Sequence, residues 1–269
     1  ARPPMSVLLQ VSDPHFGTER PALVDALVRL AQAQRPDLVL LSGDITQRAR
    51  APQFRAARAC MDRLGAPLLA IPGNHDIPLF DLWARLWHPY AGYRAAFGDE
   101  LEPVHRSADL LVLAVNTTRA HRHKHGEVSD AQIERVAAQL AAASAAQLRL
   151  VVVHQPVAVP GPQDAVNLLR GHAAACARWA EAGADLVLGG HIHLPAVLPV
   201  PGLARPLWAV QAGTAVSTRV RHGVPNSVNL LRWGAHAPPG RCTVEQWDCA
   251  AGESDYRLAA STELRPARP

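Results

Sequence analysis

Five short polar motifs, nearly all of them placed directly after an apolar, β-branched run, constrain the fold of this chain more than any other feature. Side chains that follow neighbouring strands converge at one edge of a sheet, although they are far apart in sequence. The motifs supply seven candidate oxygen or imidazole ligands, more than one metal ion needs, whereas two ions sharing a carboxylate would use them all. The motifs are Asp13-Pro14-His15, Gly43-Asp44, Gly73-Asn74-His75-Asp76, His154 and Gly190-His191-Ile192-His193.

Each motif has an ordinary explanation when it is taken alone. Asp13 fits a turn cap, Gly43-Asp44 fits a turn, and His154 fits a hydrogen-bonded core histidine. Together, however, the polar residues lie at or just past the carboxyl ends of predicted strands, where open α/β sheets bind ligands. Chance would scatter them over helices and both ends of the sheet, so the joint pattern predicts a hydrolytic two-metal centre.

The first two thirds of the chain alternate strand-like and helix-like patterns, which indicates a largely parallel sheet. Helices are predicted with Pro21 and Pro52 in their first turns and Ser129 as an N-cap. After Gly190 the pattern changes to strands without helices, which predicts a second, mainly antiparallel sheet packed on the first. The predicted strands are 7–11, 38–41, 68–71, 110–115, 150–153, 186–188, 207–211, 227–233, 243–247 and 256–258, and the predicted helices are 21–34, 52–64, 129–143 and 170–182.

Composition favours one large core. Hydrophobic residues make up 48% of the 269 residues and no linker divides them, so residues 1–269 are predicted to form a single domain. The formal net charge of +4 is spread along the chain, with Lys124 as the only lysine, which argues against a nucleic-acid partner. No apolar segment is long enough to span a membrane. Residues 1–4 are expected to be an appended remnant, with Met5 as the natural start.

The four cysteines show no metal-binding or redox spacing. Cys60 and Cys176 fall in helical patterns, and Cys242 and Cys249 lie too far apart on one extended segment to bridge. Reduced thiols and a cytoplasmic setting are therefore expected.

Residues 77–103 combine a helical pattern with an unusual number of aromatic side chains, directly after the third motif. Core packing is the favoured interpretation, and a cap that faces the substrate is the alternative. The aromatic residues are Phe80, Trp83, Trp87, Tyr90, Tyr93 and Phe97.

Two further polar segments are not assigned by the motifs. Residues 121–125 alternate histidine with Arg122 and Lys124, and a mobile polar loop is favoured there over a substrate or extra-metal role. Arg219 and Arg221 are candidates to reach a phosphate, but isolated arginines are usually solvated, so neither is predicted as a site residue.

In this form and order, the five motifs resemble those of the calcineurin-like metallophosphoesterase superfamily, and the resemblance extends from Val7 to about Asn229. The run from Gly213 to Ser227 is similar to the bacterial branch that includes class III cyclic-nucleotide phosphodiesterases. The resemblance implies a fold of the α/β (α+β) class, a four-layer α-β-β-α sandwich of two mixed β-sheets flanked by helices.

The resemblance also implies a ligand set. Carboxylate, amide and imidazole ligands suit two transition-metal ions such as Mn, Fe or Zn. Two such ions clamp phosphoryl oxygens and activate water, which is the chemistry of phosphoric ester hydrolysis. The implied ligands are Asp13, His15 and His193 for the first ion, Asn74, His154 and His191 for the second, and Asp44 bridging both.

His75 is the catalytic candidate. By the resemblance, its imidazole protonates the leaving oxygen or stabilises the charge that develops there, a step worth about 10²–10⁴-fold. Asp76 is expected to fix that imidazole, with a turn-forming role as a nearly equal alternative.

The expected activity is that of a phosphodiesterase on a small molecule, such as a cyclic nucleotide or a glycerophosphodiester. A phosphomonoesterase or lipid pyrophosphatase is the alternative, because the same metal centre serves several ester classes. A DNA exonuclease and a non-catalytic binding scaffold are less favoured, since the chain shows no basic stripe and keeps every ligand and His75. A small phosphoester is the expected partner, no membrane is expected, and a homo-oligomer is left open.

Overall fold

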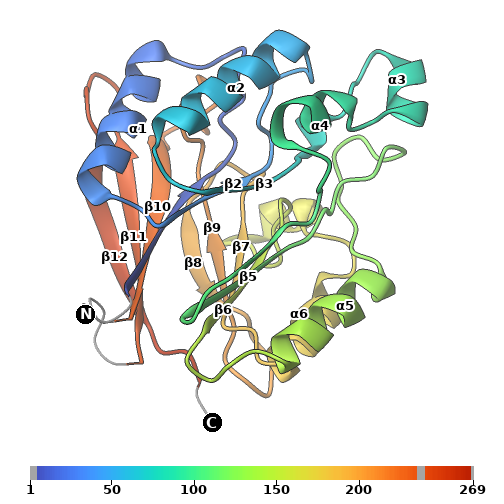
Figure 1. The fold of residues 1–269 in the computed structure, drawn as a ribbon, viewed down its shortest axis with the longest axis vertical. Coiled ribbons are helices and arrows are strands. Elements are labelled where there is room, and N and C mark those ends of the chain that lie inside the picture. Colours follow the sequence, from blue (N-terminus) through green and yellow to red (C-terminus); the bar gives the residue numbers. More distant parts are fainter. Residues whose placement is uncertain (1–4, 235–239, 268–269) are drawn as a thin grey trace.

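The computed structural model describes residues 5–234 and 240–267, which form two stacked six-stranded sheets with helices on both outer faces (Figure 1). The remnant expected at residues 1–4 lies outside this described part of the chain. Each sheet mixes parallel and antiparallel strands.

The first sheet is organised around β1, whose buried Val and Leu side chains pack on both faces. It pairs in parallel with β2 and antiparallel with β10, so the start and the end of the chain meet in one sheet. The strand order is β12-β11-β10-β1-β2-β3. The bounds are β1 (Met5–Val11), β2 (Leu38–Ser42), β3 (Leu68–Ile71), β10 (Asn226–Gly234), β11 (Cys242–Cys249) and β12 (Arg257–Leu264).

The second sheet has a parallel centre with one antiparallel strand at each edge, in the order β4-β5-β6-β7-β9-β8. Its central strands are fully buried, as is usual for parallel strands covered on both faces. The bounds are β4 (Val104–Arg106), β5 (Leu110–Ala114), β6 (Leu148–Val152), β7 (Leu186–Gly189), β8 (Ala196–Pro199) and β9 (Trp208–Gln211).

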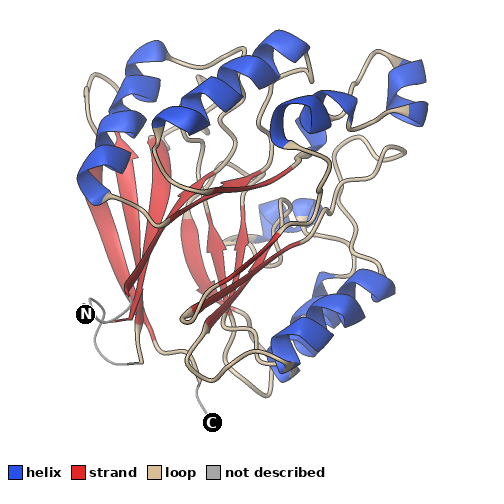
Figure 2. Cartoon of the chain, viewed as in Figure 1, coloured by secondary structure: helices blue, strands red, loops and turns tan. Residues whose placement is uncertain are grey.

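Helices cover the two outer faces, so the predicted four-layer α-β-β-α sandwich of two mixed sheets is confirmed (Figure 2). The first sheet carries α1 (Pro21–Gln34) and α2 (Ala51–Arg63), and the second carries α5 (Asp130–Ala141) and α6 (His172–Glu181). Ser129 caps α5 as predicted, with its hydroxyl accepting the N–H of Gln132. Shorter elements are α3 (Leu82–Trp87), α4 (Ala91–Phe97) and two 3₁₀ turns, Asn74–Asp76 and Pro162–Asn167.

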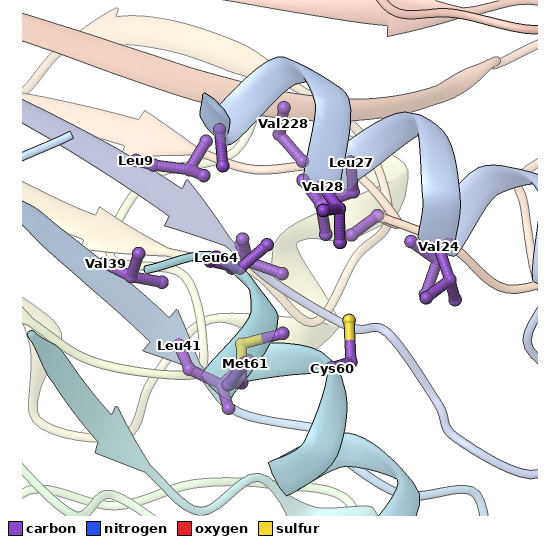
Figure 3. Close-up of a cluster of buried hydrophobic side chains, with 14 of the residues drawn as sticks. Leu9, Val24, Leu27, Val28, Val39, Leu41, Cys60, Met61, Leu64 and Val228 are labelled. Atoms are coloured by element: carbon purple, nitrogen blue, oxygen red, sulfur yellow. The ribbon is translucent and has the colours of Figure 1, made fainter. Parts of the chain in front are cut away.

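Three apolar clusters hold the layers together. One lies between α1, α2 and the first sheet, and Figure 3 shows side chains such as Leu27, Leu41 and Met61 meeting there. A second lies under α5 and α6, and the third fills the space between the two sheets. Burying such side chains contributes about 1.5–3 kcal/mol each, so the three clusters fix the relative positions of the strand ends.

The expected division into a parallel sheet followed by an antiparallel one is wrong. The parallel strands are shared between the two sheets, because β1, β2 and β3 form one group and β5, β6 and β7 the other. The strand predicted at 207–211 joins β7 in parallel, and β10 to β12 extend the first sheet from β1. The short edge strands β4 and β8 were not predicted.

Residues 77–103 divide into a packed half and an exposed half. In α4, Tyr93 is buried and its hydroxyl donates to the carbonyl of Ala70 at 2.7 Å. In α3, which projects away from the sheets in Figure 1, Trp83 and Trp87 are 69% and 64% exposed. Core packing therefore describes only the second helix.

All four cysteines are buried and free, as the sequence predicts.

Among the described residues, no helix combines the length and the apolar character needed to cross a membrane.

Candidate metal centre

The predicted ligands come from the carboxyl ends of five parallel strands, three in one sheet and two in the other. Asp13, Asp44 and Asn74 follow β1, β2 and β3 of the first sheet. His154 follows β6 of the second sheet, and His191 and His193 follow β7. The two stacked sheets therefore bring together residues that are up to 180 positions apart, from 13 to 193.

The first ligand cluster contains Asp13, His15, Asp44 and His193, with one ligand atom of each lying within 4.8 Å of the others. His15 Nε2 is 3.1 Å from His193 Nε2, which in turn is 3.3 Å from Asp13 Oδ1. Two imidazole nitrogens and a carboxylate oxygen thus face one point.

The second cluster contains Asp44, His154 and His191. His154 Nε2 lies 3.2 Å from Asp44 Oδ1 and 3.3 Å from Asn74 Oδ1, which adds the amide oxygen to this group. Asp44 belongs to both clusters, the position that a bridging carboxylate requires.

Backbone carbonyls set the orientation of two of these histidines. His154 Nδ1 donates to the carbonyl of Ser42 at 2.9 Å, and His193 Nδ1 donates to the carbonyl of Arg219 at 2.6 Å. Each contact leaves Nε2 facing the cluster, which is how metal-ligating histidines are usually held.

Unpartnered nitrogen atoms show that the residues fit metal ions. Among the described residues, His15 Nδ1 and both ring nitrogens of His191 are buried without a hydrogen-bond partner. A buried polar atom without a partner costs about 1–3 kcal/mol. Coordination would remove that cost for one ring nitrogen of His191, whereas His15 faces the cluster through Nε2 and not through the unpartnered Nδ1. The mixed imidazole, carboxylate and amide set suits Mn, Fe or Zn.

The four histidines of the two clusters differ in the direction in which burial and neighbouring charges shift their pKa. Burial lowers the pKa of His15 and of His191 to about 3, so both rings are neutral and able to ligate. Burial alone would also lower the pKa of His154, but the adjacent Asp44 carboxylate outweighs it and raises that pKa to about 9. His193 follows the same pattern with Asp13, which raises its pKa.

Metal binding is therefore expected to release protons and to tighten as the pH rises. Below a pKa of about 9 His154 carries a proton in the metal-free protein, whereas ligation requires the neutral ring. Each proton released strengthens binding about tenfold per pH unit over this range. Calorimetric titration with Mn²⁺ in buffers of different ionisation enthalpy counts those protons. An affinity that does not change between about pH 6 and 8 would contradict the pairing of His154 with Asp44.

The backbone at the ligands is strained. Asp13, His15, Asp44, His191 and His193 have φ values of 50°, 42°, 46°, 71° and 55°, in the left-handed region that side chains rarely adopt. Among the other described non-glycine residues, only Arg35 and Ala49 do so. Such strain costs about 1–3 kcal/mol per residue and is typical of functional sites.

Glycine is required where the ligand loops touch. A Cβ atom on Gly73 would overlap the backbone nitrogen of Asp44, and one on Gly43 would overlap the ring of His154. Gly73 therefore allows the loop after β3 to approach the loop after β2, and Gly43 leaves room for His154 after β6.

His75 lies at the edge of the first cluster, with its ring centroid 4.9 Å from that of His15. Its backbone N–H donates to Asp44 Oδ1 at 2.9 Å, and its Nδ1 donates to the carbonyl of Gln47 at 3.0 Å. The imidazole is thus held through Nδ1, which leaves Nε2 to face the cavity.

The hydrogen bonds of Asp76 are those of the turn-forming alternative and not of a partner for His75. Its buried carboxylate accepts backbone N–H groups of Gly73, Ile45 and Thr46 at 2.8, 3.0 and 2.8 Å. Burial, followed by the charge of Asp44, raises the pKa of Asp76 to about 6. Asp76 therefore ties the second motif to the third, and the group that holds the imidazole of His75 is the carbonyl of Gln47.

A cavity of about 590 Å³ opens over the ligands and His75. His123 and Lys124 of the 121–125 segment line it, together with Leu79 and Arg48. Gln47 was not predicted: its backbone carbonyl accepts His75 Nδ1 and its side-chain oxygen accepts Arg219 Nη1. Arg219 was set aside, and its Nη1 is 3.2 Å from His75 Nε2. The position of Arg219 within the run 213–227 was the available signal.

Comparison with known protein families decides the identity. The protein-family model described as "Calcineurin-like phosphoesterase" matches residues 6–195, more than half of the chain. The chain belongs to this family. It is a metallophosphoesterase, a hydrolase whose two clusters of His and Asp residues are consistent with a dinuclear site.

Relatives confirm the predicted resemblance to bacterial cyclic-nucleotide phosphodiesterases. A probable cyclic nucleotide phosphodiesterase of Synechococcus is 27% identical over 198 residues, which are 69% of this phosphoesterase and 72% of the relative. The cAMP/cGMP dual specificity phosphodiesterase of Mycobacterium tuberculosis is 30% identical over 213 residues, 71% of this chain and 62% of that enzyme. This phosphoesterase thus spans less than two thirds of the mycobacterial relative.

The fold has a close match among solved structures. A dimetal phosphatase from Danio rerio superposes with a TM-score of 0.68 over 97% of this phosphoesterase and 99% of that chain. At 13% identity this likeness is one of fold alone.

Proposed function

We propose that this phosphoesterase is a dinuclear metal-dependent phosphodiesterase that acts on a small molecule, such as a cyclic nucleotide or a glycerophosphodiester. The observation that carries the proposal is the pair of ligand clusters joined by Asp44 beneath one cavity. The relatives named as cyclic-nucleotide phosphodiesterases support the choice of a diester.

In the proposed centre, each sheet supplies ligands to both ions. Asp13, His15 and His193 would hold the first ion, Asn74, His154 and His191 would hold the second, and Asp44 would be shared by both. When bound, two ions of Mn, Fe or Zn polarise the phosphoryl oxygens and lower the pKa of water, which supplies the nucleophile. The strained ligand loops hold this arrangement in place before substrate binds.

His75 is proposed to serve the leaving group. Because Nδ1 donates to the carbonyl of Gln47, a proton for the departing oxygen is carried at Nε2, which faces the cavity. Asp76 acts at a distance, by holding the turn that contains Asn74 and His75 against the loop of Asp44.

The cavity favours a small substrate. A volume of about 590 Å³ suits a nucleotide or a smaller ester. Residues 77–103 contribute Leu79 to its wall, and we propose that this segment acts as a partial cap. His123 and Lys124 are proposed to contact the part of the substrate that lies outside the metal centre. The cytoplasmic setting and the oligomeric state stay as predictions from the sequence.

A panel assay in Mn²⁺ tests the function. It compares bis-nitrophenyl phosphate, nitrophenyl phosphate, 2′,3′- and 3′,5′-cyclic nucleotides, a glycerophosphodiester and single-stranded DNA, with chelator-treated protein as the control. The diesters of small molecules are expected to turn over fastest and only with metal. A clear preference for nitrophenyl phosphate would favour a phosphomonoesterase, preference for DNA a nuclease, and failure to hold close to two ions per chain a scaffold.

A further inference from the structure

Arg219 places a guanidinium group beside the catalytic candidate His75. Its Nη1 lies 3.2 Å from His75 Nε2 and 3.0 Å from Gln47 Oε1, and the residue lines the cavity over the metal centre. The same Nη1 is 3.5 Å from His75 Nδ1, so the guanidinium lies against the imidazole ring and not along the Nε2 lone pair, while Nδ1 donates to the carbonyl of Gln47.

The segment that carries Arg219 is firmly anchored. The backbone N–H of Arg219 donates to Ser217 Oγ at 3.1 Å, and its carbonyl accepts His193 Nδ1 at 2.6 Å and Thr214 Oγ1 at 3.2 Å. Asn226 Nδ2 holds the same turn through the carbonyl of Ser217 at 2.8 Å. The side chain therefore starts from a position fixed relative to the metal ligand His193.

The charge of Arg219 is not neutralised by the protein. Among the described residues, none places a carboxylate in an ion pair with it, and its side chain contacts the amide oxygen of Gln47 and the imidazole ring of His75. The neighbouring Arg221 differs, because its Nη1 pairs with Asp164 at 2.9 Å. Arg48 also lines the cavity, but it is exposed and its guanidinium lies over the ring of Phe80 at 5.5 Å.

An unpaired guanidinium that already gives an N–H group to a neutral acceptor forms stronger hydrogen bonds when an anion arrives. Phosphoryl oxygens match the forked donor geometry of arginine better than the point charge of lysine. The cavity beside Arg219 is also where the ester must lie if His75 is to reach its leaving oxygen.

We propose that Arg219 is a substrate-binding residue whose guanidinium binds a phosphoryl oxygen of the ester on the His75 side of the metal centre. On binding, this anionic oxygen becomes an acceptor for the guanidinium, and His75 Nε2 stays free to face the leaving oxygen. The inference rests on the proposed phosphodiesterase function, and it adds a protein cation to the positive charge that the metal ions supply.

The test compares the variants Arg219→Gln, Arg219→Lys and Arg48→Gln with the unmodified protein. Arg48→Gln is the matched control, because it removes the same charge from the same cavity without touching His75. Calorimetry with inorganic phosphate on the Mn²⁺-loaded proteins measures anion binding, and metal analysis and circular dichroism check that each variant is loaded and folded. Turnover of bis-nitrophenyl phosphate separates the effects on kcat and KM.

Arg219→Gln is expected to weaken phosphate binding about 10- to 100-fold, the loss of a charge-assisted hydrogen bond. Arg219→Lys is expected to recover part of this loss, and Arg48→Gln to change binding by about twofold at most through the weaker field of an exposed charge. Full metal content is expected in all three.

Three results would overturn the proposal. Unchanged phosphate binding in loaded Arg219→Gln would show that the guanidinium does not contact the anion. Equal losses in Arg219→Gln and Arg48→Gln would assign the effect to the general field of the cavity. Loss of metal from both Arg219 variants would make Arg219 a support for His193 instead. Phosphate binding does not require turnover, so a protein that binds phosphate through Arg219 but hydrolyses no diester would contradict only the proposed function.

Discussion

The variant Asp44→Asn is expected to lose at least one of the two metal ions and to lower kcat for bis-nitrophenyl phosphate by about 10³-fold or more. Asp44 belongs to both ligand clusters, so one substitution removes a negative ligand from each. It also changes the acceptor of the His75 backbone N–H and the carboxylate beside His154. Metal content after dialysis, measured by mass spectrometry, and kcat at saturating Mn²⁺ check the two effects separately.

Asp109→Asn is the matched control for this experiment. Asp109 is a carboxylate that accepts the hydroxyls of Ser107 and of Ser6 on β1 at 2.7 Å each, and it precedes β5, at the end of the strands opposite to the ligands. It is expected to keep both ions and the activity of the unmodified protein. Two ions per chain and near-normal kcat in Asp44→Asn would show that Asp44 does not bridge them.

Replacing His75 by alanine is expected to slow hydrolysis by about 10²–10⁴-fold for diesters with a poor leaving group and much less for nitrophenyl esters. A nitrophenolate departs without a proton, whereas a ribose or glycerol alkoxide needs one. The effect should therefore grow along a series of aryl diesters as the leaving group becomes more basic. Single-turnover rates across the series provide the measurement.

Two controls make the His75 experiment decisive. His172→Ala removes an imidazole at the start of α6 that does not line the cavity, and it is expected to leave the rates unchanged. Metal analysis of His75→Ala must give two ions, because the backbone N–H of residue 75 still reaches Asp44. Full turnover of an ester with a poor leaving group would exclude the acid role, and an equal loss along the whole series would assign His75 to charge stabilisation instead.

Local patterns predicted the elements of this fold better than their pairing. Helix α1 has the predicted bounds, because Pro21 marks its first turn and the apolar period is clear, and β3 also agrees residue for residue. The assignment of strands to sheets failed because a strand such as β9 reads the same whether it pairs with β7 or with β10. Pairing is decided by which faces the three apolar clusters bury, and these depend on residues distant in the chain.

At the site, the side chains of the two candidate ligand clusters could be found from the sequence, whereas the backbone groups that orient them could not. The motifs identified every residue of the two clusters, because ligand chemistry is restricted to few residue types. The carbonyls of Ser42, Gln47 and Arg219 orient three histidines, and any residue type supplies a carbonyl. The left-handed backbone at five of the candidate ligands could not be predicted either, because none of these residues is a glycine.

The candidate ligands are divided between the two sheets, and this couples metal binding to the packing of one sheet on the other. Asp13 of the first sheet accepts the backbone N–H of His191, and the carbonyl of Ser42 accepts Nδ1 of His154, so both contacts cross the interface between the sheets. Two bound ions would add coordinate bonds across that interface and cross-link the two sheets. A cavity made by truncating Leu8 or Val112, deep between the sheets, would then shift the ligands of one sheet relative to those of the other. The metal affinity therefore reports on the relative position of the two sheets.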